Sequence, residues 1–430
     1  MQEERNLVGS KMKRTLLILS FTFMGLITIV AQSADVYVTG YLTNEKGNRV
    51  ATVWKNSEKL YQLTDGEQGA LTYSIYVAGN DVYVAGTENN AAGISEGRVW
   101  KNGEKLYSFT HATQSVYAYS VIVSGNDVYV AGNWHVVGTA NRTGKVWKNG
   151  TELYSFDGSV SGMCILNNDI YVGGQSGGEA KVWKNGTVCW TTNTTNFSPS
   201  VQHICESNGE IYVSFNFTSS TTVYVAKIIQ GGYSFNSVWT QSFSSGYSSA
   251  RANSFAVSGS NVYVLVNSTM TSYTPQFFNY KNSTVIESRA NRSGKMYLFD
   301  DDIYLAVKNS YDKSLKVYKN ETELYILNEE GHYFDDVSDI FVVKYGNASI
   351  NNIQKSDVSF YPNPVKDKLY IQTETGIDKI DIYDMLGKKV FTLNVNDKTE
   401  INISHLPKGV YAVYVFLENR IIGSNKIVKQ

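Results

Sequence analysis

A short apolar strand pattern recurs along most of the chain. Each copy starts with a polar residue and continues with alternating aliphatic and aromatic residues, as in Asp81-Val82-Tyr83-Val84. Seven copies begin at residues 35, 81, 127, 169, 210, 261 and 302, so successive copies start 41 to 51 residues apart. This spacing is the length of a four-stranded propeller blade and is too long for most solenoid repeats.

A second strand pattern follows most of the copies. It reads Val-Trp-Lys-Asn at residues 53–56, 99–102, 146–149 and 182–185, and Tyr-Lys-Asn at 280–282 and 318–320. Three of these strings run into Asn-Gly, which tolerates the positive φ angles of a two-residue hairpin turn. A further strand precedes several first patterns, for example at residues 120–123, and ends in a Gly-Asn turn. The repeat therefore predicts four antiparallel strands, named A to D in chain order.

The two ends of the array predict a closed ring. The first copy begins at its B strand, and no strand A precedes it after the apolar N-terminus. The seventh D strand is followed by an extra strand pattern at residues 337–343. We expect this segment to pair with residues 35–38, because the pairing supplies the missing strand and removes an open sheet edge. The predicted fold class is all-β: a seven-bladed β-propeller over residues 34–346.

The N-terminus has the pattern of a secretory signal peptide. Lys11, Lys13 and Arg14 precede an apolar stretch at residues 16–30, and small residues follow at 31–33. We expect cleavage before Ala34, with residues 1–33 forming the signal peptide and a possible upstream extension. The apolar stretch is shorter than a membrane span needs, so the mature form should lack a transmembrane helix.

From residue 356 onward the repeat patterns stop and a different set of motifs appears. Its members are Tyr361, Pro362, Asn363, Pro364, Gly387, Lys388, Pro407, Gly409, Tyr411 and Lys426. In this order, and at the end of the chain, they resemble the type A C-terminal sorting domain of the Bacteroidetes type IX secretion system. The resemblance implies that the type IX machinery is a partner, that the protein is secreted or attached to the cell surface, and that the domain is usually removed.

The same C-terminal segment alternates short strands with turn residues, which suits a small Ig-like β-sandwich over residues 356–430. Residues 347–355 are the expected linker. The Val-Trp-Lys-Asn-Gly strings of the body resemble repeats of exported, mostly uncharacterised bacterial propeller proteins, and that resemblance implies no activity.

Charge and cysteine content exclude several classes of function. The chain has 38 Lys and Arg against 39 Asp and Glu, a net charge of -1, so we expect no nucleic acid partner. Cys164, Cys189 and Cys205 are too few for a disulfide framework and are interpreted as small apolar strand residues, with one bridge as a minor alternative. No Cys or His cluster has metal-ligand spacing, so no metal or cofactor is expected.

The loops between strands B and C and between D and the next A vary in length, so their face is the candidate binding face. Residues eight positions before each B strand should surround the channel mouth on that face: Tyr73, Tyr119, Ser161, Gln202, Asn253 and Gly294. Nearby loops add His111, Trp134, His135, Arg142, Tyr247, Arg251 and His332. Aromatic rings with amide and Arg donors suit sugar or peptide recognition, although each residue could instead cap the propeller core.

Two other features have structural interpretations. Trp54, Trp100, Trp147 and Trp183 recur in four consecutive repeats, which favours packing between blades over a sugar platform. The acidic run at residues 300–302 occupies a turn that Gly-Asn fills elsewhere, so an acidic turn is favoured over a cation site. Asp335, Asp336 and Asp339 form a similarly weak candidate.

No catalytic motif is present, so the sequence predicts no enzyme. There is no nucleophile elbow, no HExxH and no phosphate-binding glycine loop. The favoured function is a secreted or cell-surface binding module for a glycan or protein. The alternatives are a polysaccharide lyase or hydrolase at the channel mouth, marked by a carboxylate, His and Tyr within hydrogen-bond reach, and a structural surface protein without a concave aromatic site.

Overall fold

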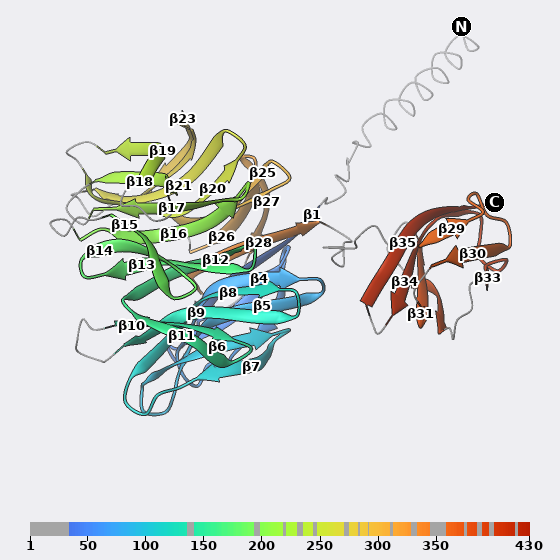
Figure 1. Cartoon of the computed structure of the whole chain (residues 1–430), viewed down its shortest axis with the longest axis horizontal. Helices are drawn as coiled ribbons and strands as arrows, with labels where there is room; N and C mark the ends of the chain where they lie inside the picture. Colours follow the sequence, from blue (N-terminus) through green and yellow to red (C-terminus); the bar gives the residue numbers. More distant parts are fainter. Residues whose placement is uncertain are drawn as a thin grey trace, which may run out of the picture. The chain divides into compact units, whose positions relative to one another are not determined.

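The computed structural model describes most of the chain after the predicted signal peptide. The described residues are 34–135, 142–192, 198–217, 221–229, 235–243, 247–270, 275–282, 284–290, 292–309, 313–327, 333–344, 358–373, 376–384, 389–394, 400–417 and 420–430. The predicted signal peptide (1–33) and linker (347–355) lie outside them. Described residues 34–344 form seven four-stranded antiparallel sheets (Figure 1).

The first four sheets follow the chain in order. They contain β1 (Ala34–Thr43), β2 (Arg49–Lys55) and β3 (Glu58–Gln62); β4 (Ala70–Ala78), β5 (Asp81–Asn89), β6 (Ser95–Lys101) and β7 (Glu104–Phe109); β8 (Ser115–Ser124), β9 (Asp127–His135), β10 (Arg142–Lys148) and β11 (Thr151–Asp157); and β12 (Ser159–Leu166), β13 (Asp169–Ser176), β14 (Glu179–Lys184) and β15 (Thr187–Thr191). The fourth strand of the first sheet comes from the far end of the array.

The other sheets continue the same order. They contain β16 (Ser200–Ser207), β17 (Glu210–Asn216), β18 (Thr222–Ile228) and β19 (Phe235–Ser242); β20 (Tyr247–Ser258), β21 (Asn261–Met270), β22 (Pro275–Lys281) and β23 (Thr284–Ala290); and β24 (Arg292–Phe299), β25 (Asp302–Asn309), β26 (Leu315–Lys319) and β27 (Thr322–Leu327). The next strand, β28 (Tyr333–Lys344), belongs to the first sheet.

The ring closes as predicted. Strand β28 pairs antiparallel with β1, with Val343 opposite Asp35 and Ile340 opposite Val38. The strands in the A position contact one another in the cyclic order β4, β8, β12, β16, β20, β24, β28 and back to β4. The all-β propeller prediction is therefore confirmed.

The recurring Asp and Lys-Asn residues form one repeated network. In the second sheet, the Asp81 carboxylate accepts hydrogen bonds from Lys101 Nζ at 2.8 Å and Asn102 Nδ2 at 2.7 Å. Asn102 Oδ1 accepts the Val82 backbone N–H at 2.8 Å, and Asn102 (φ 52°) and Gly103 (φ 90°) form the tight turn. The same contacts recur around Asp127 and Asp169, so the sequence pattern records a turn that joins strands B, C and D.

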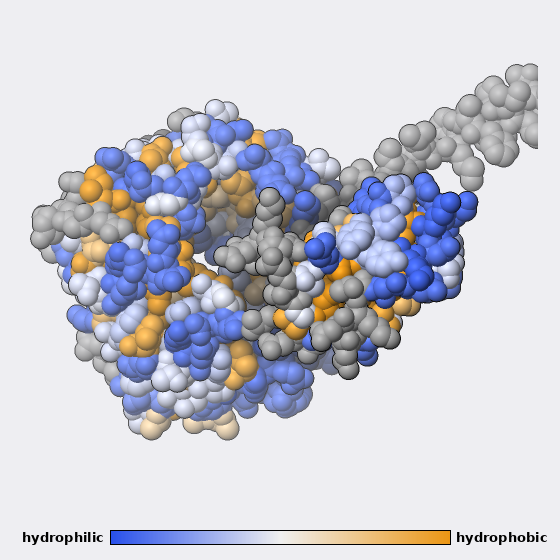
Figure 2. Space-filling model, turned by 45° about the vertical axis from the view of Figure 1, so that its right-hand side comes forward, coloured by the Kyte–Doolittle hydropathy of each residue, from blue (hydrophilic) through white to orange (hydrophobic). Residues whose placement is uncertain are grey.

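The tryptophan series is buried between sheets. Trp54, Trp100, Trp147 and Trp183 are each at most 4% exposed. Phe109 and Trp147 stack with ring centroids 4.3 Å apart, and Phe156 and Trp183 stack at 4.2 Å. The prediction that these rings pack the blades is confirmed. On the face shown in Figure 2, the apolar side chains of the propeller lie in separate patches among polar ones.

The C-terminal part is a two-sheet β-sandwich. One sheet contains β29 (Ser359–Tyr361), β30 (Lys368–Gln372) and β33 (Glu400–Asn402). The other contains β31 (Lys379–Asp384), β32 (Lys389–Asn394), β34 (Gly409–Leu417) and β35 (Arg420–Lys429). Leu369, Ile382 and Val413 are buried in one core that both sheets share. In the described part of the chain, no helix has the length and apolar character of a membrane span.

Candidate functional site

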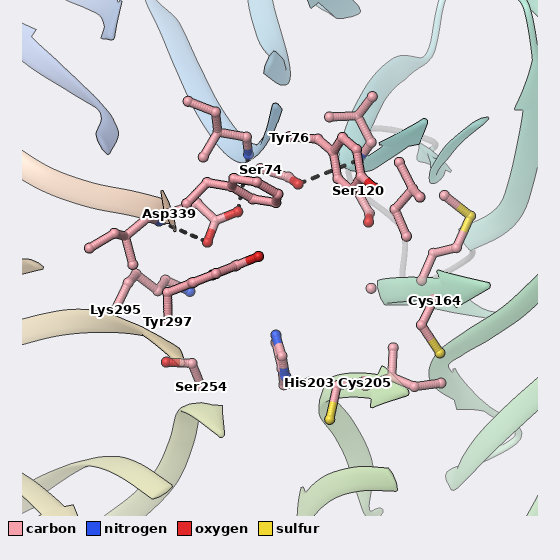
Figure 3. Close-up of a pocket in the computed structure, with 18 of the residues that line it drawn as sticks. Ser74, Tyr76, Ser120, Cys164, His203, Cys205, Ser254, Lys295, Tyr297 and Asp339 are labelled. Carbon is pink, nitrogen blue, oxygen red and sulfur yellow. Dashed lines mark hydrogen bonds between the residues drawn. The ribbon is translucent and has the colours of Figure 1, made fainter. Parts of the chain in front are cut away.

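A central channel of about 650 Å³ is the candidate site. Its wall is made by all seven strands in the A position: β4, β8, β12, β16, β20, β24 and β28. Figure 3 shows polar and aromatic side chains extending from these strands toward the open centre. The repeat thus places one set of variable residues per sheet around a shared cavity.

The residues predicted at the channel mouth occupy β-bulges. Tyr73, Tyr119, Ser161, Gln202 and Asn253 line the cavity, and each is the extra residue at a register shift of its strand. Gly294 differs, because β24 pairs with β25 without a shift. Ser338 of β28 is the sixth bulge residue that lines the cavity, and the sequence pattern did not point to it. A bulge turns its extra residue out of the regular alternation, which directs these side chains to the channel.

Glycines on the neighbouring B strands make room for several bulges. A Cβ atom on Gly86 would lie 2.1 Å from the Leu71 carbonyl oxygen, and one on Gly132 would lie 1.9 Å from the Tyr117 carbonyl oxygen. A Cβ atom on Gly174 would lie 1.7 Å from the Ser159 carbonyl oxygen. The recurring glycine therefore marks the bulge that positions the channel residue.

Tyrosines gather where β4 and β8 meet at the channel. The rings of Tyr73 and Tyr119 lie 4.8 Å apart, and Tyr117 stacks nearly parallel on Tyr119 at 5.7 Å. Burial raises the pKa of Tyr119 to about 12 and raises the pKa of Tyr73 as well. Both hydroxyls are therefore protonated at neutral pH and can donate hydrogen bonds.

The residue after each bulge residue, and after Gly294 in β24, forms a second layer, which we name the girdle. Its members, each opposite the residue four positions after the start of the repeated B-strand pattern, are Ser74, Ser120, Gly162, His203, Ser254, Lys295 and Asp339. All seven line the channel. The sequence pattern did not point to this layer, although His203 and Lys295 directly follow the predicted positions Gln202 and Gly294.

Three girdle side chains each accept a hydrogen bond from the next sheet of the ring. Ser74 Oγ accepts the Val121 backbone N–H at 3.4 Å, and Ser254 Oγ accepts the Met296 N–H at 2.9 Å. Asp339 Oδ2 accepts the equivalent amide, Ile75 N–H, at 3.0 Å. Asp339, one of the three residues of the weak acidic candidate, is thus part of the propeller's internal hydrogen bonding.

Asp339 also satisfies an amide of its own strand. Its Oδ1 accepts the Ile340 N–H at 3.0 Å. This is the amide that the girdle residue of the preceding sheet would bind, but that residue is Lys295, whose ammonium group has no hydrogen-bond acceptor. Burial raises the Asp339 pKa to about 6, against the opposing effects of the Lys295 charge and of hydrogen bonds from Ile75, Ile340 and Ser74. The carboxylate is still mostly ionised at neutral pH.

His203 and Lys295 are the other titratable girdle residues. Burial, with a contribution from the Lys295 charge, lowers the His203 pKa to about 4, so the imidazole is neutral at pH 7. Its Nδ1 is buried without a hydrogen-bond partner among the described residues, and its ring meets Phe255 edge-on at 5.3 Å. Lys295 Nζ donates to the Asn253 carbonyl oxygen at 3.5 Å.

Two positions past the girdle, the channel wall carries aromatic side chains on one side and small side chains on the other. Phe341 contacts Tyr76 at 5.1 Å and Tyr297 at 4.8 Å between ring centroids. Cys164 and Cys205 stand at the equivalent positions of β12 and β16, and both are free. Burial raises the pKa of both thiols, which fits their interpretation as apolar wall residues and not as nucleophiles.

The other predicted loop residues do not line the channel. The His111 ring lies 4.9 Å from Trp134, and Lys145 Nζ lies over that indole at 3.7 Å. His135 and Arg142 are opposite one another at the ends of β9 and β10. Tyr247 packs against Phe243 and Phe278, and Arg251 is exposed on β20. His332 lies outside the described residues.

A carboxylate, a histidine and a tyrosine, the groups expected of a lyase, line the channel without hydrogen bonds between them among the described residues. Asp339, His203 and Tyr297 all line the channel, yet no hydrogen bond connects any two of them in the part of the chain that the structure describes. Across the same described ranges, no three His, Cys, Asp or Glu side chains are placed to hold a metal ion.

The C-terminal motif residues bind one another in the sandwich. Asn363 Nδ2 donates to the Lys426 carbonyl oxygen at 2.7 Å, and Asn363 Oδ1 accepts the Val428 N–H at 2.9 Å. Tyr411 donates its hydroxyl hydrogen to the Pro407 carbonyl oxygen at 2.7 Å. Gly387 and Lys388 lie outside the described residues. The motifs thus fix the last strand and one corner of the sandwich.

Solved structures of similar architecture are distant. A putative 6-phosphogluconolactonase from Bacteroides uniformis is 12% identical, with 73% of this chain and 100% of that chain covered and a TM-score of 0.39. The C-terminal WD40 domain of Sif2 is 13% identical, with 72% and 90% covered and a TM-score of 0.41. These scores support no conclusion about activity. No curated protein matches the chain.

The C-terminal segment has a specific match. Residues 359–430 match the family described as "Secretion system C-terminal sorting domain", a range that contains all ten motif residues. The match confirms the resemblance to the type IX sorting domain and indicates export, either to the medium or to the cell surface. The chain therefore carries a β-propeller and, at residues 359–430, a secretion system C-terminal sorting domain.

Proposed function

We propose that the propeller is the binding module of this exported protein and takes a glycan or protein ligand at the channel mouth. The observation that carries this proposal is the cluster of Tyr73, Tyr117 and Tyr119 beside a channel of about 650 Å³. Partly accessible aromatic rings beside a concave cavity provide flat contact area together with hydroxyl donors. A purely structural surface protein needs no such site.

A binding role is favoured over a lyase or hydrolase because Asp339 is engaged with two backbone amides. A catalytic base must be within reach of the proton that it removes, and its lone pairs must be available. The polar groups of the girdle serve recognition and sheet-to-sheet contacts in this proposal.

A glycan and protein binding screen on the purified protein tests the proposal. Replacing both Tyr73 and Tyr119 by Ala should weaken binding of any ligand found by about tenfold or more, since stacking contacts are lost. Tyr361→Ala, which removes an exposed tyrosine of the sorting domain, is the matched control and should leave binding unchanged. Full binding by the double variant would show that the ligand is held elsewhere.

A further inference from the structure

The charged side of the girdle presents hydrogen-bond donors to the channel. Lys295 carries an ammonium group, and Tyr297 carries a hydroxyl whose pKa is raised by burial and which therefore stays protonated. The neutral imidazole of His203 has one N–H group. Figure 3 shows Tyr297 and His203 extending toward the same open centre, with Lys295 beside Tyr297. The wall at this point is suited to an acceptor group of a ligand.

The Lys295 charge is not paired with a carboxylate. Among the described residues it forms no ion pair within 4.0 Å, although its charge acts on the Asp339 carboxylate from a greater distance, and the Asn253 carbonyl oxygen at 3.5 Å is its hydrogen-bond acceptor. Asp339, in the next sheet, directs its two oxygens to the Ile75 and Ile340 amides. An ammonium has three N–H donors, so Lys295 keeps donor capacity that the protein does not use.

The opposite side of the girdle leaves space for a ligand. Ser120 and Gly162 are small and uncharged, and their strands β8 and β12 lie opposite the Lys295 strand β24 in the ring. A Cβ atom on Gly162 would meet only the Ile204 side chain, at 3.5 Å. The channel is thus open where its wall is neutral and carries donors where its wall is charged.

We propose that the channel wall at the girdle forms a subsite for the carboxylate of an acidic sugar, with Lys295 as its cation and His203, together with Tyr297 two positions past Lys295, as further donors. This inference rests on the proposed binding function. A carboxylate suits these donors because hydrogen bonds between charged groups are strong where water is restricted. A sugar is favoured over a peptide terminus because the tyrosines at the mouth offer ring faces to the next residues of the same chain.

Paired ligands that differ only in charge test the subsite. Calorimetric titration of the purified protein compares oligogalacturonate, oligoglucuronate and oligomannuronate with their neutral methyl esters. At least one acid should bind about tenfold or more tightly than its ester at low salt, and added salt should reduce the difference. Lys295→Met should reduce the preference to below about twofold, whereas Lys295→Arg should retain it. Lys105→Met, which removes an exposed lysine of the outer strand β7, should change nothing.

The outcomes separate the subsite from the binding function. Equal binding of acid and ester overturns the carboxylate subsite and leaves the binding module intact. If a folded Lys295→Met protein still prefers the acid to its ester, another cation binds the carboxylate, which also overturns the assignment of Lys295. If peptides with a free C-terminus bind and no acidic glycan does, the assignment of the ligand as an acidic sugar is wrong. Failure of all glycans and proteins to bind overturns both proposals.

Discussion

Asp339 accepts a hydrogen bond from the backbone N–H of Ile75 at 3.0 Å, although the two residues are 264 positions apart. Asp339 lies on β28 and Ile75 on β4, so the contact links the last strand of the array to the second sheet. Together with the pairing of β28 and β1, it is part of the closure of the ring.

Removing the Asp339 side chain should destabilise the propeller. Asp339→Ala leaves the Ile75 and Ile340 amides without their acceptor, and we expect a loss of about 2 kcal/mol in the free energy of unfolding. Asp339→Asn keeps one acceptor oxygen and removes the buried charge, so its loss should be about 1 kcal/mol or less. Urea denaturation measures both. Asp157→Asn, an exposed carboxylate on β11, is the control and should be neutral. Equal stability of the Ala variant and the wild type would contradict the role.

Stability should respond to pH through Asp339 and His203 in opposite directions. The Asp339 pKa is raised from 3.8 to about 6, so the folded state holds the proton more tightly and stability is lost as pH rises from about 4 to 6. The His203 pKa is lowered from 6.5 to about 4, so stability is lost as pH falls over nearly the same window. The two effects offset one another in the wild-type protein.

Single substitutions should expose each effect. Relative to the wild type, Asp339→Asn should gain stability as pH rises from 4 to 6, because only the His203 effect remains. His203→Gln should show the reverse slope. Each change should be on the order of 2 kcal/mol across the window. Denaturant midpoints at several pH values measure the slopes, and parallel curves for all three proteins would refute the assignment.

The bulges should depend on the glycines opposite them. Gly86→Ala places a Cβ atom 2.1 Å from a backbone oxygen, so the bulge at Tyr73 must shift, at a cost of about 3 kcal/mol. Gly162→Ala, whose new atom has only an ordinary contact at 3.5 Å, should change stability by less than about 0.5 kcal/mol. Thermal and urea unfolding compare the two. A stable Gly86→Ala protein would show that the bulge is not constrained by this contact.

Truncations should separate ring closure from the sorting domain. Ending the chain after residue 330 removes β28 and with it the buried side chains of Phe334, Val337 and Ile340. The melting temperature should fall by about 10 °C or more, or folding should fail. Ending the chain after residue 357 removes the C-terminal sandwich, which has its own core, and should change propeller melting by only a few degrees. Similar melting of both truncated proteins would contradict this division.

The sequence by itself determined the repeat, the four-strand unit, the closing strand and the sorting domain. These features rest on local patterns: alternating apolar residues, the Lys-Asn-Gly turn and ordered C-terminal motifs each act over a few neighbouring residues. The buried tryptophans and the place of Tyr73 and Tyr119 beside the channel could also be predicted, because the repeat fixes their register.

The set of side chains that share the channel follows from the closed ring and not from local sequence. His203, Lys295 and Asp339 share one position of the repeat, but their residue types follow no motif, and the closed ring brings their side chains into one layer. Their charge states depend on burial and on the field of neighbouring sheets, which have no counterpart in local sequence. The repeat predicted the pairing of the closing strand, but the Asp339 contact with Ile75 could not be predicted, because the hydrogen-bond partners of one side chain depend on how adjacent sheets pack.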